Sequence, residues 1–211
     1  MHQISKPTLE YFFSKSRIEK YQQYSGDKNF IELYQLNIIW SEKFFTLLSQ
    51  FEVILRNAIS QKLIVDFGEN WFNCQSLIFA AKQQQAIDEV TKRLLEKSKN
   101  LNPCNVTSNL SFGFWISLFS PNYDKTLWRT SLYNIFSNSS TKLSRSKLRE
   151  RLQKFLTLRN RISHCECIIH FPLVKYSQQL VETTSWINPE IANWFNKFVE
   201  FLAIQNQLNQ S

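Results

Sequence analysis

The clearest pattern of apolar and polar positions in this chain lies between residues 30 and 67. Apolar side chains recur there at steps of three and four residues, which places them on one face of an α-helix. Gly68 follows directly, as glycine commonly does at the C-terminus of a helix. The pattern predicts one long helix over residues 30–67, with a buried face made of Leu36, Trp40, Phe44, Leu47, Phe51, Ile54, Ala58 and Ile59.

Shorter stretches with the same periodicity predict further helices. Pro172 is expected in the first turn of one of them, where proline is tolerated, and Asn188–Pro189 is a typical helix start. Strand-like alternation of apolar and polar residues is absent, so the predicted fold is all-α. The other helical stretches are residues 8–24, a charged amphipathic segment at 80–101, a short apolar helix and turn within 109–128, and residues 144–163.

The composition narrows this fold to a helical bundle. Only 3 Gly and 5 Pro occur among 211 residues, too few turn-forming residues for a sandwich or a barrel with many hairpins. The 18 Phe, 7 Tyr and 6 Trp residues fit a core of large side chains between helices. We therefore expect a single helical domain over residues 1–211, with a long central helix and extra flanking helices.

The charge of the chain favours a polyanionic partner. Lys and Arg number 25 against 17 Asp and Glu, which gives a formal net charge of +8. Such a balance fits nucleic acid or an acidic surface. No signal-peptide pattern and no long apolar run are present, and four cysteines do not form a disulfide framework in a chain of this length. We expect a cytoplasmic protein with no membrane partner.

One short phrase occurs twice. "ILRNAISQ" stands at residues 54–61 and "LTLRNRISHCE" at residues 156–166, and both contain Leu-Arg-Asn-x-Ile-Ser. The first copy fits a structural role, with Glu52 and Arg56 spaced as a favourable i, i+4 ion pair. The second copy adds His164, a residue that can take up or release a proton near neutral pH. The second copy is therefore the candidate site.

The second copy brings together residues suited to phosphodiester cleavage. Asn160 and His164 fall on one helix face, one turn apart, whereas Arg159 lies about 140° from His164 on an ideal helix. Arginine offers a permanent charge and donors suited to phosphate. Arg159 and His164 can converge if the helix loosens near His164, or if a second subunit completes the site. A histidine that caps the helix would explain the sequence equally well.

The stretch "LRNRISHCE" resembles the Arg-x-x-x-x-His motif of HEPN-domain ribonucleases. "FEVILRNAI", "FGENW", "FGFWISLF" and a following "LW" stand in the same order as in the Abi-like (abortive infection) branch of that superfamily. The resemblance covers roughly residues 30–185. It implies a HEPN-type helical bundle.

Site residues follow from this resemblance position by position. Arg159 and His164 match the catalytic pair, and Asn160 matches the polar residue that often follows the arginine. Glu52 and Arg56 match a recurrent Glu and Arg on the long helix, as supporting residues or as a structural ion pair. Further supporting or RNA-binding candidates are Arg161, Glu166, Lys147 and Arg151. Where relatives commonly read His-His-Glu-Pro, this chain has Cys165 and Cys167 in place of the second histidine and the proline, which puts the local loop shape in question.

The activity implied by the resemblance is that of a metal-independent endoribonuclease without a cofactor. It would act as a homodimer on RNA, in a phage-defence or toxin–antitoxin system with a protein or RNA antitoxin. A non-catalytic RNA- or partner-binding module is the main alternative, and a pure interaction protein is a third. The intact Arg159, Asn160 and His164 favour the enzyme over the non-catalytic module, whereas a large exposed apolar patch in the aromatic C-terminal tail would favour the interaction protein.

Three other stretches carry open or rejected interpretations. The basic run at residues 141–155 is either a solvated helix face or a surface that follows RNA phosphates. The run "HCECIIH" at 164–170 is too tight for a tetrahedral zinc site, so no metal is predicted, and a disulfide between Cys165 and Cys167 is disfavoured by geometry. The aromatic tail at 186–204 is either core or an interface.

Overall fold

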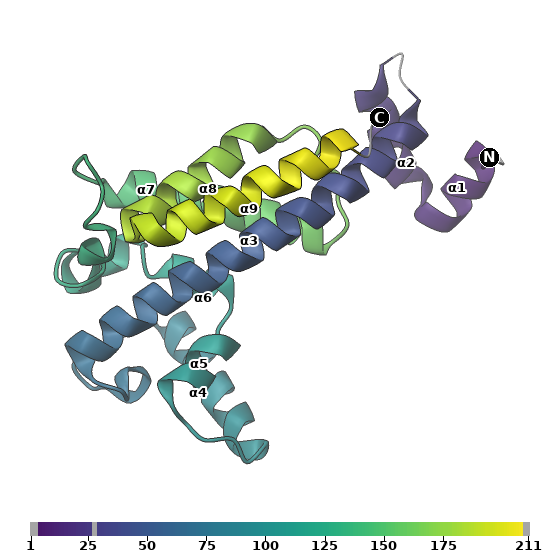
Figure 1. Ribbon diagram of the computed structural model, residues 1–211. Helices are drawn as coiled ribbons and strands as arrows, with labels where there is room; N and C mark the ends of the chain where they lie inside the picture. The colour runs from purple at the N-terminus through teal and green to yellow at the C-terminus, as the bar shows by residue number, and fades with distance from the viewer. Residues whose placement is uncertain (1–3, 27–28, 209–211) are drawn as a thin grey trace.

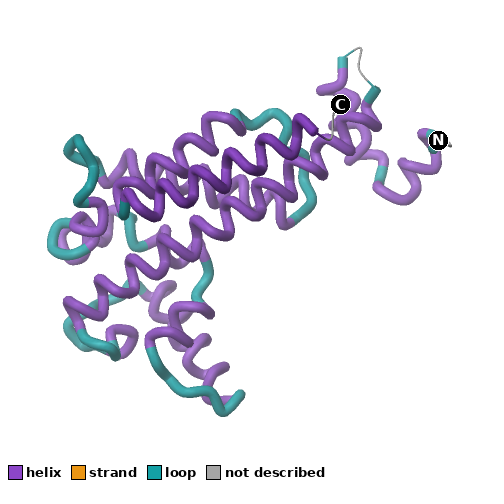
Figure 2. The backbone as a smooth tube through the Cα atoms, in the orientation of Figure 1, coloured by secondary structure: helices purple, strands orange, loops and turns teal. Residues whose placement is uncertain are grey.

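The computed structural model describes residues 4–26 and 29–208, with their side chains except Phe198 and 201–208. Figures 1 and 2 show helices joined by turns, and no strand occurs in these ranges, which confirms the predicted all-α fold. The helices are α1 Lys6–Phe13, α2 Lys15–Ser25, α3 Phe30–Phe67, α4 Ala81–Glu96, α5 Pro103–Asn109, α6 Phe112–Ser117, α7 Arg145–Ser163, α8 Leu173–Ile187 and α9 Pro189–Leu208. Single turns lie between them: η1 Trp71–Asn73, η2 Pro121–Tyr123, η3 Asp124–Trp128 and η4 Leu132–Phe136.

The long helix α3 has the bounds that its periodicity predicts, and the physical signals at both ends are visible. The side chain of Asn29 accepts a hydrogen bond from the Ile31 N–H at 3.0 Å and so caps the N-terminus. Gly68 adopts a positive φ of 85°, and its N–H donates to the Ile64 carbonyl oxygen at 2.8 Å. The predicted buried stripe is confirmed at its centre, where Phe51 and Ile59 are fully buried.

Helices α7 and α8 pack along one side of α3, and α9 packs against α8 and completes the bundle (Figure 1). Phe51 of α3 meets Phe155 of α7 edge to face, with ring centroids 5.3 Å apart. Phe155 in turn contacts Tyr176 of α8. Helix α7, which carries the second copy of the Leu-Arg-Asn phrase and is called the motif helix, is thus fixed by large rings on both sides.

A second group, α4, α5 and α6, branches from the far end of α3 (Figure 1). Its core holds Trp71 and Trp115 with ring centroids 5.9 Å apart, and both rings are fully buried. Helix α4 ends earlier than the predicted 80–101, because Ser98 takes a left-handed φ of 53° and closes the helix. The apolar residues of this group are continuous with those of the bundle in one hydrophobic cluster.

The N-terminal stretch 8–24 was predicted as one helix, and this is wrong: the chain breaks at Ser14, where φ is 70°. The break lets residues of both helices contact one ring of α3. Phe13 and Tyr21 lie 5.3 and 5.0 Å from the Tyr34 ring, measured between centroids. A straight helix would not bring both residues to Tyr34, so tertiary packing overrides the local helical pattern.

Two features of the C-terminal region also differ in detail from expectation. Pro172 is the N-cap residue of α8 and not part of its first turn. In the aromatic tail, Phe195 is fully buried whereas Trp194 is 54% exposed, so this tail is core on one face only. The side chains of residues 201–204 lie outside the described part. Among the described residues, no helix combines the length and the apolar character needed to cross a membrane.

Candidate functional site

The site candidates lie at the C-terminal end of α7, the helix predicted at 144–163. Its buried face consists of Leu148, Leu152, Phe155, Leu158 and Ile162. On the opposite side, Asn160 and His164 are both exposed, one turn apart, as their spacing predicts. Packing of the apolar face therefore fixes which face of α7 presents these two polar side chains to solvent.

The helix stays regular up to His164. The His164 N–H donates to the Asn160 carbonyl oxygen at 3.0 Å, so the helix does not loosen there. Cys165 then adopts a left-handed φ of 52°, and the Glu166 N–H donates to the Arg161 carbonyl oxygen at 2.8 Å. This is the Schellman pattern that closes many helices, usually with glycine at the left-handed position. Because the helix is regular, Arg159 and His164 remain on different sides of α7.

The chain after α7, residues 164–168, is called the motif loop below, and it is held by a residue that sequence reasoning missed. The side-chain oxygen of Asn37, on α3, accepts from the Ile168 N–H at 2.8 Å. Its amide group donates to the Glu166 carbonyl oxygen at 3.4 Å. The Arg17 guanidinium, on α2, donates to the Cys165 carbonyl oxygen. Asn37 is only 4% exposed, and a polar residue amid the apolar pattern of a long helix is the signal that could have revealed it.

Arg159 points toward α3 and not toward His164. Its Nε lies 3.9 Å from Oε2 of Glu52, whereas Arg56, the partner expected from the i, i+4 spacing, directs Nη1 to the Ser108 carbonyl oxygen at 3.5 Å. Burial raises the pKa of Glu52 above its usual value, and the charges of Arg159 and Arg56 oppose that shift. The three predicted residues Glu52, Arg56 and Arg159 are thus neighbours, with Arg159 as the close partner of the carboxylate.

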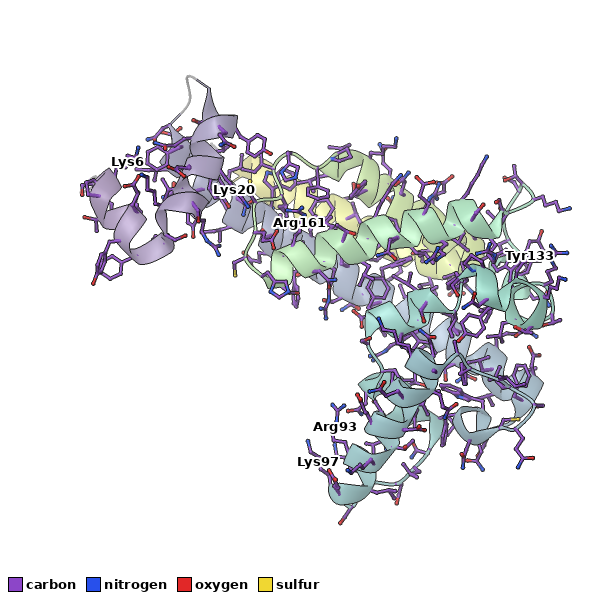
Figure 3. The ribbon with its side chains drawn as sticks, turned by 180° about the vertical axis from the view of Figure 1, so that it is seen from behind. Lys6, Lys20, Arg93, Lys97, Tyr133 and Arg161 are labelled. Atoms are coloured by element: carbon purple, nitrogen blue, oxygen red, sulfur yellow. The ribbon has the colours of Figure 1, made fainter. Side chains whose placement is uncertain are left out.

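Arg161 and Glu166 form a second polar group beside the motif loop. Arg161 Nη1 lies 2.9 Å from Glu166 Oε2, and the Arg161 guanidinium lies over the Phe171 ring, 5.5 Å from its centroid. Figure 3 shows Arg161 near the C-terminal end of α7. These contacts hold the start of the segment that leads to α8 against α7.

An open groove of about 490 Å³ adjoins the motif on the α3 side. Ile162, Ser163 and Cys165 line it from the end of α7 and the motif loop. From α3 come Ile38 and Phe45, which are 52% and 48% exposed. An exposed apolar strip of this kind, beside polar site candidates, is typical of a surface that another chain covers.

The basic run at residues 141–155 divides between different faces of α7. Arg151 faces α8, where its Nη1 lies 2.7 Å from Glu182 Oε2 and its guanidinium lies 4.5 Å from the Trp186 ring centroid. Arg151 thus packs against α8 in the fold, and its assignment to the RNA-binding set stays a prediction. Lys147 is exposed, and it takes part in no ion pair within the described ranges.

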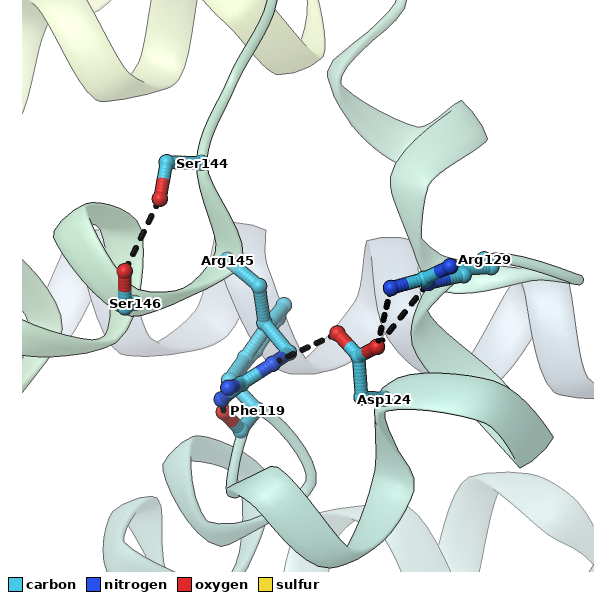
Figure 4. Close-up of polar contacts among 6 residues, drawn as sticks. All are labelled: Phe119, Asp124, Arg129, Ser144, Arg145 and Ser146. Atoms are coloured by element: carbon cyan, nitrogen blue, oxygen red, sulfur yellow. Dashed lines mark hydrogen bonds and ion pairs between the residues drawn. The ribbon is translucent and has the colours of Figure 1, made fainter.

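At the start of α7, Arg145 is also engaged within the fold. Its Nε donates to Asp124 Oδ1 at 2.9 Å, and its Nη1 donates to the Phe119 carbonyl oxygen at 2.6 Å (Figure 4). Arg129 binds the other oxygen of Asp124 at 2.8 Å. The hydrogen bond from Arg145, together with Arg129, lowers the pKa of Asp124 below its usual value, so this carboxylate is already neutralised by two arginines.

The four Cys and His residues of "HCECIIH" lie in different surroundings. His164 and Cys165 are exposed, whereas Cys167 is buried. The His170 ring stacks on Tyr24 of α2 at 5.3 Å, and burial, together with the charges of Arg161 and Lys20, lowers its pKa. Across residues 4–26 and 29–208, no three His, Cys, Asp or Glu side chains gather as metal ligands would.

Comparisons with known proteins add no relative to this picture. No family model, no curated protein and no solved structure matches the chain.

Proposed function

We propose that this chain is a metal-independent endoribonuclease of the HEPN type, related to Abi-like proteins, with Arg159, Asn160 and His164 as its site. The observation that carries the proposal is the exposure of Asn160 and His164, one turn apart, at the end of a helix whose opposite face is buried. His164 is the C-cap residue of α7 through its backbone N–H, which donates to the Asn160 carbonyl oxygen, but its side chain is exposed and not part of the core. No hydrogen bond involves the His164 ring among the described residues, which leaves it free for a substrate.

The proposed reaction uses the 2′-hydroxyl of the RNA itself. One His164 takes the proton from the 2′-oxygen, which attacks the adjacent phosphorus, while a second His164 protonates the departing 5′-oxygen. Arg159 stabilises the negative charge on the phosphorane. The products are a 2′,3′-cyclic phosphate and a 5′-hydroxyl end, and the chain supplies all the acid and base groups that this reaction needs.

A homodimer follows from the position of Arg159. Within one chain, Arg159 contacts Glu52 on α3, and the helix keeps it on a different side from His164. A second chain seated on the apolar strip with Ile38 and Phe45 would bring a second copy of the motif to the same cleft. The proposed site is therefore composite, with an arginine and a histidine drawn from both chains.

By analogy with the family, the biological role would be a toxin or phage-defence effector in the cytoplasm, restrained by an antitoxin. A non-catalytic binding module is the second candidate. The separation of Arg159 from His164 within one chain favours it, since a site that is never completed would bind RNA without cutting it.

The first experiment incubates wild type and His164→Ala with mixed cellular RNA in the presence of EDTA. Cutting by wild type alone supports the proposal, and end analysis should then find 2′,3′-cyclic phosphates. A matched oligonucleotide with a 2′-deoxy residue at the cut position should remain intact. His2→Ala serves as the control for histidine removal, because it lies far from the motif in sequence.

Two results would contradict the proposal. Equal cutting by wild type and His164→Ala places the activity outside the motif. Absence of cutting by wild type, with RNA binding intact, leaves the binding module as the function.

A further inference from the structure

An open groove of about 500 Å³ runs along α7 from Arg145 to Thr157; we call it the α7 groove. Residues of α7 form one wall, and Phe171, just before α8, and Tyr176, in its first turn, contribute aromatic side chains to the lining. The α7 wall includes Arg149, Glu150, Lys154 and Thr157. A hollow of this size accommodates groups as large as a nucleobase.

The α7 groove is aligned with the proposed site. Ser146, Gln153 and Thr157 line it, and Asn160 and His164 continue the same row at steps of three and four residues. At 1.5 Å per residue, the row extends about 27 Å from Ser146 to His164. A chain lying in the groove would therefore reach His164 without crossing to another face of the helix.

A second hollow continues the α7 groove beyond the N-terminal end of α7. It holds about 490 Å³, shares Arg145 and Ser146 with the α7 groove, and reaches Arg129 and Tyr133. Figure 3 shows Tyr133 and Arg161 at opposite ends of α7. The two hollows therefore form one continuous surface from Tyr133 to Thr157 of α7.

The charged groups along this surface favour phosphate. Arg149 is exposed and has no ion pair within the described ranges, and Arg129 is 70% exposed although it binds Asp124. Lys154 is 48% exposed and pairs with Glu150 at 2.7 Å. Both carboxylates that line the surface, Asp124 and Glu150, are thus already paired with cations, and the net charge of the side chains is positive.

Aromatic lining and cationic rim together match the way in which proteins hold single-stranded nucleic acid, with bases on rings and phosphates on Lys and Arg. Duplex RNA keeps its bases stacked inside and cannot insert them into such a groove. Arg161, which lies over Phe171, connects the lining to the motif loop.

We propose that the α7 groove binds single-stranded RNA and leads it to His164, with phosphates on Arg149 and Lys154 and a base beside Phe171. The statement that the groove leads RNA to His164 rests on the proposed ribonuclease function. Binding in the groove is measurable without any cleavage. The substrate class of the proposed site is then RNA with an unpaired segment.

The test measures fluorescence anisotropy of a labelled 12-nucleotide RNA with full-length His164→Ala, which removes the proposed base and so preserves the RNA. We expect tighter binding of the single strand than of the same sequence in a duplex, and weaker binding of an abasic strand of equal length. In Arg149→Gln and Lys154→Gln, each made in the His164→Ala chain, the slope of log affinity against log salt should become shallower by roughly 0.7 per lost phosphate contact.

Glu150→Gln should raise the RNA affinity, whereas Arg149→Gln and Lys154→Gln should lower it, because Glu150→Gln removes a negative charge from the same groove. Its affinity for the single strand should rise about twofold to fivefold, an estimate for one surface charge. The matched control is Arg93→Gln with Lys97→Gln, two exposed cations at the C-terminal end of α4 that lie far from α7 in Figure 3. This control should change affinity less than the groove variants do.

The outcomes separate the two proposals. If wild type cuts RNA through His164 but the groove variants bind like the α4 control, the groove assignment is overturned and the ribonuclease stands. If the groove variants lose affinity while wild type does not cut RNA, the groove stands and the ribonuclease falls. Equal affinity for single-stranded and duplex RNA, or for the abasic strand, also overturns the groove.

Discussion

Arg159 and Glu52 lie on different helices, 107 residues apart in sequence, and their side chains approach to 3.9 Å between Nε and Oε2. The contact ties the motif helix α7 to the centre of α3. It also holds the proposed catalytic arginine beside a carboxylate that burial has made harder to ionise. The same pair therefore connects the stability of the fold with the proposed chemistry.

Replacing Glu52 with Gln should stabilise the fold at neutral pH. The folded-state pKa of Glu52 is raised, so the stability linked to its protonated form is full below the unfolded pKa and is lost as pH rises through the folded pKa. Glu52→Gln should therefore melt at a higher temperature than wild type at neutral pH, with the difference shrinking toward acidic pH. Thermal melts across this range test it against Glu69→Gln, an exposed control. If the melting-temperature difference between Glu52→Gln and wild type instead grows toward acidic pH, the predicted pH dependence is wrong.

Cys165→Gly should stabilise the end of α7. A left-handed residue other than glycine costs about 1 kcal/mol, and Cys165 has a φ of 52°. In a chain of this size, that corresponds to a rise in Tm of roughly 2–4 °C. Ser98 ends α4 in the same way, with a φ of 53°, so Ser98→Gly is the matched control away from the motif. A lower Tm for Cys165→Gly than for wild type would show that its thiol makes a contact worth more than the relieved strain.

Asn37→Ala should loosen the motif loop. The change leaves the Ile168 N–H, which now donates to Asn37 at 2.8 Å, without that partner at a buried position. The expected loss is about 1–3 kcal/mol in the free energy of unfolding. Hydrogen exchange of the Ile168 amide should accelerate, while Asn57→Ala, at an exposed position of the same helix, should leave it unchanged. Unchanged exchange in Asn37→Ala would mean that water replaces the side chain.

Arg151→Ala should destabilise the fold without changing RNA affinity. Its guanidinium binds Glu182 at 2.7 Å and lies over Trp186, contacts that together contribute about 1–2 kcal/mol. Denaturant titration measures the first effect, and anisotropy with RNA measures the second. Lys147→Ala, at an exposed position of the same helix, should leave stability within about 0.5 kcal/mol of wild type. A large loss of RNA affinity in well-folded Arg151→Ala would instead support the RNA-binding role predicted from the sequence.

Phe45→Asp should separate the proposed homodimer. The Phe45 ring is 48% exposed in the groove beside the motif, and a buried charge at an interface between two chains strongly opposes association. Sedimentation equilibrium should find monomers of Phe45→Asp, and RNA cutting should fall with the dimer. Val65→Asp, on the same helix and 77% exposed, is the control. Dimers of unchanged affinity in Phe45→Asp would move the interface elsewhere.

Much of the helical framework was predictable because helix signals are local. The period of apolar residues and the glycine at position 68 located α3 to the residue, and the same logic located α7. The exposed side of α7 with Asn160 and His164 also followed from spacing alone. Ser14 shows the limit of this reasoning, since the break there depends on contacts with Tyr34, 20 residues further along.

The partners of the charged residues were not predictable in the same way. The spacing made Arg56 the expected partner of Glu52 on the same helix, yet the closer partner of Glu52 is Arg159 from α7. Arg151 belongs to a basic run, and only the position of α8 turns it into a packing residue. Asn37 acts on a backbone amide 131 residues away. Each of these roles depends on where two helices cross.

The sequence by itself determined the all-helical fold, the bounds of the two principal helices and the face on which Asn160 and His164 lie. These features depend on interactions over three or four residues, which the order of the residues contains directly. The tertiary structure alone decided the Arg159–Glu52 contact, the anchoring of the motif loop by Asn37 and the aromatic lining of the α7 groove. Such features arise where helices distant in sequence pack together, because burial of their apolar faces sets the positions of all other side chains.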